Sequence, residues 1–322
     1  MTHHLQKIAV ATLFALCPLA TAAQQYPAKP VRFIIPFPPG GPTDIMGRIA
    51  ADILAKSTGQ QFIVDNRGGA GGNIGADLCA KAPADGYTIC MITAAQGVSP
   101  AIYKKMSYDP VKDLATVTLM ANLPSLLTVH PALPAKNVKE LLAIAKAKPD
   151  ALTYASTGNG SSPHMLMEML KFYTGAKMVH VPYKGQAPAV VDQISGQVQL
   201  AFNTAIGVMP HVGSGRLKAI AVSSKERFPP MPDLQTVEEG GVKDFDGGSW
   251  QGVGAPAGTP PDIIRRLNTI LVTELKTPAM REQMIKRGAL VSANTPEEFS
   301  AFLKAEIAKW TKIAKAAKIS ID

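Results

Sequence analysis

The sequence has 322 residues, of which 46% are hydrophobic and 18% are charged, and its formal net charge is +9. This balance is typical of a globular protein with a real core, and it excludes a low-complexity or disordered chain. The lysines are spread along helical stretches such as 136–148 and 304–318, with no basic run interleaved with aromatic residues. Nucleic acid is therefore not an expected partner, whereas the positive charge favours an anionic ligand.

The N-terminus has the pattern of a secretory signal peptide. Lys7 precedes a short apolar core over 8–16, which is too brief to span a bilayer, and small residues that suit cleavage follow at 20–23. We therefore expect residues 1–23 to be removed and the mature chain to be soluble in the periplasm. Cys17 is not expected to carry a lipid anchor, because Leu16 is too large for the position before a lipidated cysteine.

The segment after residue 30 joins a buried strand to an amphipathic helix. Val31–Ile35 is a nearly continuous apolar run, as expected of a strand inside a parallel sheet. Apolar residues then recur at helical spacing, and Pro42 suits the first helical position. Gly40 and Gly41 place no side chain over the helix start, so its free N–H groups and its dipole are open to an anion. Asp44, in the first turn, complements that dipole.

Strands and helices alternate through the rest of the chain. Strands are expected over 62–66, 87–93, 152–156, 178–182, 198–202 and 217–222, with further apolar segments at 126–130 and 252–255. Helices are expected up to about residue 82 and over 138–148, 163–173, 187–194, 262–275 and 296–317. This alternation predicts an α/β fold with largely parallel sheets, and roughly 300 mature residues suggest two domains.

Two glycine-rich loops follow expected strands. The loop 68–72 lacks the Gly-Lys-Ser/Thr of a Walker loop and the spacing of a dinucleotide fingerprint, so a tight strand-to-helix turn is the favoured interpretation. The loop 157–163 precedes a helix, and Ser161 or Ser162 suits the N-cap position of that helix. The same geometry makes a second anion cradle at a strand end, and capping and binding are compatible.

No catalytic or metal-binding constellation stands out. The histidines after the signal peptide have no metal-ligand spacing, and no carboxylate pair stands in a hydrolase context. An alternative from another class is an exported serine hydrolase that uses Ser162 and His164. Side chains two residues apart diverge at a helix start, and His164 stands where a nucleophile elbow needs glycine. We therefore expect no enzyme activity, no cofactor and no metal.

Cys79 and Cys90 are the two cysteines of the expected mature chain. They either form a disulfide in an oxidising compartment or are two small buried hydrophobic residues. Both alternatives remain, because the sequence does not place their Cα atoms.

Several short motifs keep a specific order and spacing along the chain. They lie at 26–32, 36–44, 65–75, 85–88, 157–164, 181–185, 210–212 and 255–260. Through these motifs, essentially the whole mature chain resembles the periplasmic solute-binding receptors of the tripartite tricarboxylate transporter family, also called Bug receptors. Each motif is weak alone, and their combination is specific.

The resemblance implies a two-lobed periplasmic-binding-protein clamshell, similar to type II, with a mainly parallel sheet flanked by helices in each lobe and a ligand cleft between the lobes. It implies that residues 24–122 and 249–322 form lobe 1 and that 123–248 form lobe 2. The protein is then expected to be a monomer that captures a small carboxylate or dicarboxylate, aromatic ones included, and delivers it to the membrane subunits of a tripartite tricarboxylate transporter. The alternative partner is a membrane sensor, such as a sensor kinase, to which the receptor presents its ligand.

The resemblance also implies ligand-binding residues in both lobes. The loop 37–43 would hold one carboxylate, largely through backbone groups and ordered waters, and the loop 157–164 would hold the far end, with Ser161 and Ser162 as donors. The full expected set is Phe37, Pro38, Gly40, Gly41, Thr43, Asp44, Thr157, Gly158, Ser161, Ser162, His164 and Asn203.

Asn203 departs from the pattern of the family. Many members have Phe-Asp-Asn where this chain has Phe202-Asn203-Thr204, and the aspartate of those members can face the ligand. Asparagine is neutral, so the substitution removes a negative charge from the cleft. This argues against an amino-acid ligand, whose ammonium group requires that aspartate, and it favours a plain carboxylate or dicarboxylate.

The exported protein is expected to begin at Ala23 or Gln24 and to carry no lipid, because small residues precede both positions. Intact-mass analysis of the exported form checks this. A mature chain that starts at Cys17 with the added mass of acyl groups contradicts it.

Overall fold

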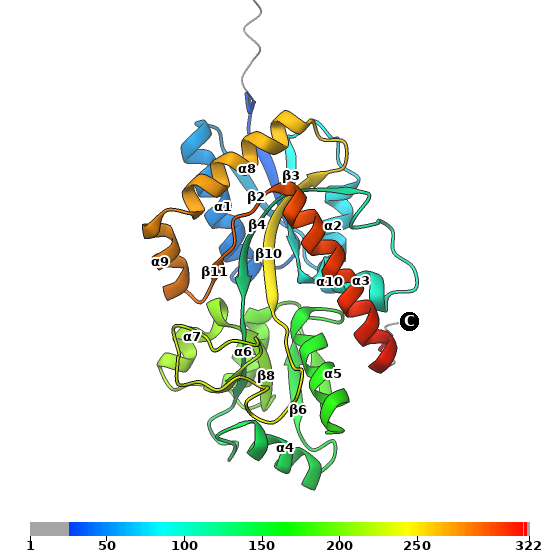
Figure 1. The fold of residues 1–322 in the computed structure, drawn as a ribbon, viewed down its shortest axis with the longest axis vertical. Coiled ribbons are helices and arrows are strands. Elements are labelled where there is room, and N and C mark those ends of the chain that lie inside the picture. The colour runs from blue at the N-terminus through cyan, green and yellow to red at the C-terminus, as the bar shows by residue number, and fades with distance from the viewer. Residues whose placement is uncertain (1–25, 318, 321–322) are drawn as a thin grey trace, which may run out of the picture.

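The computed structural model describes residues 26–317 and 319–320. Within them, two α/β lobes lie one above the other along the long axis of the molecule (Figure 1). The expected signal peptide, residues 1–23, lies outside the described residues. None of the helices in the described chain combines the length and the apolar character that a membrane span requires.

Lobe 1 is built on a six-stranded sheet with the order β11-β4-β10-β3-β1-β2. Its strands are β1 (Val31–Ile35), β2 (Phe62–Asn66), β3 (Thr88–Thr93), β4 (Leu114–Leu123), β10 (Ser249–Pro256) and β11 (Leu290–Val291). Its helices are α1 (Pro42–Thr58), α2 (Asn73–Ala80), α3 (Ala94–Ile102), α8 (Pro261–Leu275), α9 (Pro278–Lys286) and α10 (Pro296–Ala317), with a short 3₁₀ turn at Ala70–Gly72.

Lobe 2 is built on a five-stranded sheet with the order β7-β6-β8-β5-β9. Its strands are β5 (Ser125–Val129), β6 (Thr153–Ser156), β7 (Val179–Pro182), β8 (Leu200–Thr204) and β9 (Lys218–Val222). Its helices are α4 (Val138–Ala147), α5 (Ser162–Thr174), α6 (Gln186–Ile194) and α7 (Ala205–Gly213). The chain enters this lobe at Pro124, between β4 and β5, and returns to lobe 1 through the segment 223–248.

Both sheets are mixed, whereas the sequence predicts largely parallel sheets. β10 lies between β3 and β4 and runs antiparallel to both, and β5 lies between β8 and β9 in the same way. Each of these two strands is the first that the chain forms after it changes lobe. Such a strand is not preceded by a crossover helix in its own sheet, which is the connection that parallel neighbours need.

β1 lies between β2 and β3 in the sheet of lobe 1 and runs parallel to both. Phe33 and Ile34 have no exposed surface, so the expected buried parallel strand is confirmed. Phe33 faces the cluster in which α1 places Met46, Ala50 and Leu54, and Ile34 faces the opposite cluster, beneath α2. The sheet is thus covered on both faces, and the loop after β1 is held at the edge where the strands end.

The C-terminal helix α10 packs in both lobes. Phe299 and Leu303 belong to a lobe 1 cluster, whereas Trp310 and Ala314 are buried in the large cluster of lobe 2. Figure 1 shows α10 alongside α3, with its end directed toward α5. The end of α10 therefore packs with lobe 2, although the sequence-based limits place all of 249–322 in lobe 1.

Cys79 of α2 and Cys90 of β3 form a disulfide, with 6.1 Å between their Cα atoms. Both residues are fully buried beneath the sheet of lobe 1. The structure thus decides between the two alternatives that the sequence leaves, and the bond ties α2 to a central strand.

Replacing both cysteines with alanine should lower the free energy of unfolding by about 3 kcal/mol, because the bond closes a short loop in the unfolded chain. Urea denaturation of the oxidised proteins measures the difference. A reductant should destabilise the wild type and leave the Cys79→Ala/Cys90→Ala variant unchanged. Equal stability of the two oxidised proteins contradicts this role of the bond.

Candidate ligand-binding site

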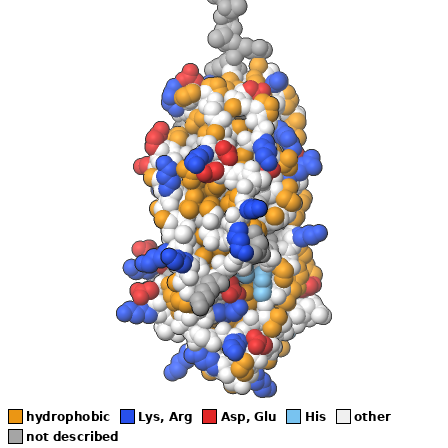
Figure 2. Space-filling view, turned by 90° about the vertical axis from the view of Figure 1, so that its right-hand side faces the viewer, with side chains coloured by type: hydrophobic (Ala, Val, Ile, Leu, Met, Phe, Trp, Pro, Cys, Tyr) orange, Lys and Arg blue, Asp and Glu red, His pale blue; other side chains and the backbone are white. Residues whose placement is uncertain are grey.

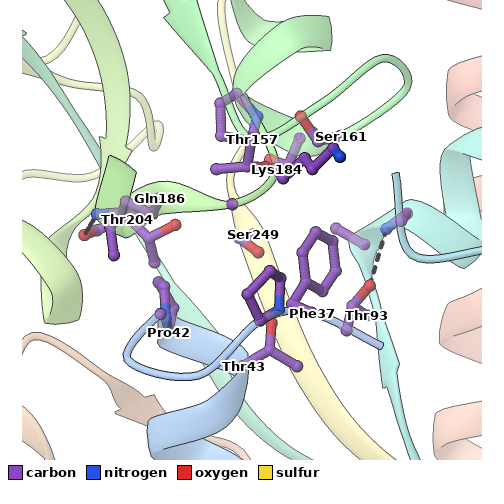
Figure 3. A pocket seen from close by; sticks show the side chains of 18 of the residues that line it. Phe37, Pro42, Thr43, Thr93, Thr157, Ser161, Lys184, Gln186, Thr204 and Ser249 are labelled. Atoms are coloured by element: carbon purple, nitrogen blue, oxygen red, sulfur yellow. Dashed lines mark hydrogen bonds between the residues drawn. The ribbon is translucent and has the colours of Figure 1, made fainter. Parts of the chain in front are cut away.

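A cavity lies between the lobes, with a volume of about 530 Å³ when its open mouth is counted. Lobe 1 lines it with the loop after β1 and the start of α3, lobe 2 lines it with residues near the starts of α5, α6 and α7, and β10 adds Ser249 and Gln251. Figure 3 shows Lys184, Thr157 and Ser161 gathered on one side of the cavity, and Gln186 and Thr204 beside Pro42 on another. A bound molecule would therefore touch both lobes and the strand that connects them.

Five helices begin at this cavity. The residues at their N-cap positions all line it, and they are Gly41 of α1, Thr93 of α3, Ser161 of α5, Gly185 of α6 and Thr204 of α7. Of these, only Thr93 caps its helix with its side chain. The first N–H groups of a helix have no intrahelical partner, and the helix dipole is positive at that end. The cavity is thus surrounded by backbone groups that favour an anion.

Side chains add little charge of their own to the cavity. Among the described residues that line it, Lys184 is the one with an ionisable side chain, and it is exposed at the rim. Elsewhere, on the face shown in Figure 2, lysine and arginine side chains are dispersed among acidic and neutral ones. The absence of a carboxylate from the lining means that an anionic ligand meets no repulsion from an aspartate or glutamate.

The carboxylate of Asp44 holds the loop before α1 through hydrogen bonds. The carboxylate of Asp44 accepts hydrogen bonds from Gly40 N (3.0 Å), Arg48 Nε (2.9 Å) and Asn66 Nδ2 (3.0 Å). Burial opposes ionisation, but these donors hold the pKa of Asp44 below its ordinary value. Asp44 therefore acts on the loop at the helix start, as its position in the first turn suggests, and a direct contact with the ligand stays a prediction.

The two serines at the start of α5 do not cap it as the sequence suggests. Ser161 Oγ donates to Gly158 O (2.6 Å), and Ser162 Oγ donates to Gly248 O (2.9 Å). Ser161 occupies the N-cap position, but its side chain makes no capping hydrogen bond. Pro163 explains this in part, because it stands second in the helix, where it offers no N–H to a capping oxygen. The donors that remain free for a ligand at this helix start are backbone N–H groups.

Two stacked histidine rings hold the loop 157–162 and the strand before it through hydrogen bonds. The ring centroids of His164 and His180 lie 4.2 Å apart. His164 Nδ1 accepts from Gly160 N (3.2 Å), and His180 Nε2 shares a hydrogen bond with Ser156 Oγ (2.6 Å). Burial lowers the pKa of both rings, and for His180, where the neighbouring His164 adds to the effect, the pKa falls to about 4. Both rings are neutral at pH 7, and their hydrogen bonds position the loop.

The structure brings seven of the expected residues to the cavity: Phe37, Pro38, Gly41, Thr43, Thr157, Ser161 and Ser162. Gly40, Asp44, Gly158, His164 and Asn203 are not in its lining. The amide of Asn203 donates to Thr128 Oγ1 (2.8 Å) and Gln193 Oε1 (2.7 Å) within the buried part of lobe 2. Ligand contacts by these five residues stay predictions.

Sequence reasoning missed the starts of α3 and α6 and the two residues of β10. Gly185 precedes a helix, as Gly41 does, and this shared pattern could have drawn attention to Lys184 and Gln186. Gln251 gives no such signal, because only the pairing of β10 with β3 and β4 shows where its side chain points.

Comparison with known proteins places the chain in a family. A family model described as the tripartite tricarboxylate transporter family receptor matches residues 46–319. The chain belongs to this receptor family. It is a family of substrate-binding receptors rather than of enzymes, so the expectation of a binding protein is confirmed, and the hydrolase alternative based on Ser162 and His164 is not supported.

Curated relatives match the receptor over nearly its whole length. Protein BugT of Bordetella pertussis is 36% identical over 317 residues, which cover 98% of this chain and 97% of that protein. A protein from the tcbD-tcbE intergenic region of Pseudomonas sp. strain P51 is 33% identical over 312 residues, which cover 96% and 93% of the two chains. The family resemblance inferred from the motifs is thus confirmed.

Solved structures confirm the two-lobed fold of the receptor. A protein of R. palustris with adipate superposes with a TM-score of 0.89 at 36% identity, covering 92% of this chain and 99% of that one. The periplasmic binding protein BugD gives 0.87 at 35% identity, with the same coverage. MatC from Rhodopseudomonas palustris with bound malate gives 0.85 at 30% identity, covering 89% and 99% of the two chains.

The stability of the receptor should fall as the pH drops from 6.5 toward 4. The pKa of His180 is lower in the folded protein than in the unfolded chain, so the unfolded chain binds more protons between these pH values. Acid therefore favours the unfolded chain. Above pH 6.5 the ring is neutral in both states, and the contribution of His180 to stability is complete. Replacing His180 with phenylalanine, which keeps a ring against His164, should flatten the profile between pH 6.5 and 5.

Urea denaturation at several pH values measures this dependence. A His130→Phe variant, altered at a histidine outside the stacked pair, is the matched control for the loss of an imidazole ring. A wild-type stability that is constant from pH 7 to pH 5 contradicts the expected role of His180.

Proposed function

We propose that this receptor captures a small carboxylate or dicarboxylate, aromatic ones included, in the cavity between its lobes and delivers it to the membrane subunits of a tripartite tricarboxylate transporter. The observation that carries the proposal is the meeting of five helix N-termini at a cavity with no carboxylate among the described residues that line it. Two related structures support it, since one R. palustris protein was solved with adipate and MatC with malate.

The same proposal places the receptor in the periplasm. The basic and apolar pattern of residues 1–23 and the periplasmic binding protein BugD, a relative at 35% identity, support this location. A disulfide between Cys79 and Cys90 is also suited to an oxidising compartment.

A panel of mono-, di- and tricarboxylates, aromatic acids among them, tests the proposal. A ligand that binds the native receptor and not the unfolded chain raises the melting temperature, and calorimetry then gives its affinity. Neutral sugars and free amino acids serve as controls and should give no shift. A panel in which no carboxylate raises the melting temperature contradicts the proposed function.

Replacing Gly41 with leucine should weaken carboxylate binding by about a hundredfold, because hydrogen bonds to a charged group contribute ~1.5–3 kcal/mol each and 1.4 kcal/mol is tenfold. The new side chain would lie over the N–H groups at the start of α1. The fold should tolerate it, since Gly41 has a φ of −89° and a Cβ there would meet nothing closer than Pro38 O at 3.9 Å.

Gly213→Leu is the matched control. Gly213 is the last residue of α7, and a Cβ at this position would have no neighbour within 4 Å. Circular dichroism should be unchanged for both variants, and calorimetry measures the affinity of each. Wild-type affinity in a folded Gly41→Leu variant would show that the loop before α1 is only a structural turn.

A further inference from the structure

Two of the residues that line the cavity are buried glutamines, and their amide oxygens have no hydrogen-bond partner among the described residues. Gln186, the first residue of α6, is 3% exposed, and Gln251, on β10, is 2% exposed. Both belong to the lining, and the Oε1 atom of each has no hydrogen-bond partner among the described residues. Buried polar atoms are nearly always hydrogen-bonded in native proteins, so two such atoms at one cavity require an explanation.

The NH₂ end of each glutamine side chain donates a hydrogen bond within the protein. Gln186 Nε2 donates to the backbone carbonyl of Thr204 (3.0 Å), and only the NH₂ end of an amide can do so. In the structure, Gln251 Nε2 donates to Thr43 Oγ1 (3.2 Å) at the start of α1. The remaining atom of Gln186 must therefore be an acceptor, and that of Gln251 is Oε1 as the structure places the amide, so the partner of each is a donor.

A carboxylate cannot be that partner, because an ionised carboxylate has only acceptor oxygens. The carboxylate of a ligand instead fits the N–H groups of the helix starts and the side that carries Lys184, which Figure 3 shows apart from Gln186 and Thr204. The molecule that satisfies the whole cavity thus carries a hydrogen-bond donor in addition to its carboxylate.

The donor should be neutral. An ammonium group bound to either amide oxygen would lack a counter-charge, since the described part of the chain places no aspartate or glutamate in the lining. A buried unpaired charge is costly, whereas a hydroxyl satisfies an amide oxygen without bringing charge.

We propose that Gln186 and Gln251 form a neutral acceptor subsite that selects hydroxycarboxylates over carboxylates without a hydroxyl group. This inference rests on the proposed function, because it assumes that the ligand is a carboxylate. It assigns to these two glutamines a role in specificity, separate from the helix starts that bind the charge.

Calorimetry with matched acids tests the subsite. The pairs are succinate and malate, butyrate and 3-hydroxybutyrate, and benzoate and 4-hydroxybenzoate, whose members differ by one hydroxyl group. In a pair that binds, the hydroxylated member should bind about tenfold to a hundredfold more tightly, the usual effect of leaving a buried acceptor unpaired.

Glutamine-to-methionine variants locate the effect, because methionine keeps the length of the side chain and removes the acceptor. The ratio of the two dissociation constants within a pair should fall toward one in Gln186→Met and in Gln251→Met. Gln235→Met is the control, since Gln235 Nε2 also donates to a backbone carbonyl, that of Ile220 (3.2 Å), but Gln235 lies outside the cavity. This control should keep the wild-type ratio.

The outcomes separate the two proposals. Plain acids that bind as tightly as their hydroxylated partners overturn the subsite and leave the carboxylate receptor standing, as would happen if an ordered water satisfied both oxygens with every ligand. If Gln186→Met and Gln251→Met both keep the wild-type preference for the hydroxylated acid, the subsite is overturned as well. Failure of the whole carboxylate panel to bind, these six acids included, contradicts the proposed function together with the subsite.

Discussion

The site depends on one electrostatic constraint, which is that helix N-termini from both lobes point at the same space. In an α/β lobe, the helix that follows a strand begins at the carboxyl end of that strand. Because the two lobes turn these ends toward each other, α1 and α3 face α5, α6 and α7 across the cavity. The attraction for an anion therefore comes from the backbone, and the cavity needs no cluster of lysine or arginine side chains.

The strand β10, which the chain forms on its return to lobe 1, is also part of the site. β10 inserts antiparallel into the sheet of lobe 1, and its first residues reach the cavity at Ser249 and Gln251. Gly248, directly before it, accepts a hydrogen bond from Ser162 at the start of α5. The connection between the lobes is thus in contact with both the cavity and the start of α5 in lobe 2.

Sequence reasoning succeeded where the signal was local and failed where it depended on distant partners. The apolar run of β1 and the glycines before α1 specify their structure within a few residues, and the structure places both as expected. Ser161 is a residue type that commonly caps helices. Its hydroxyl instead donates to the carbonyl of Gly158, and Pro163 offers no N–H that it could accept. The position of Gln251 depends on the pairing of β10 with a strand more than a hundred residues away in the sequence, and no local pattern predicts that pairing.

The helix α10 joins the two lobes along one edge of the cleft. Its first part is anchored in lobe 1 through Phe299, and its last part is anchored in lobe 2 through Trp310, whose indole N–H also binds Glu306 on the same helix. A rotation that parted the lobes along this edge would have to withdraw Trp310 from its pocket or bend the helix. The edge beside α7 and α9 is also closed by packing, because Ile206 of α7 lies in the hydrophobic cluster of lobe 1 that includes Met284 of α9, so parting the lobes there would expose both side chains.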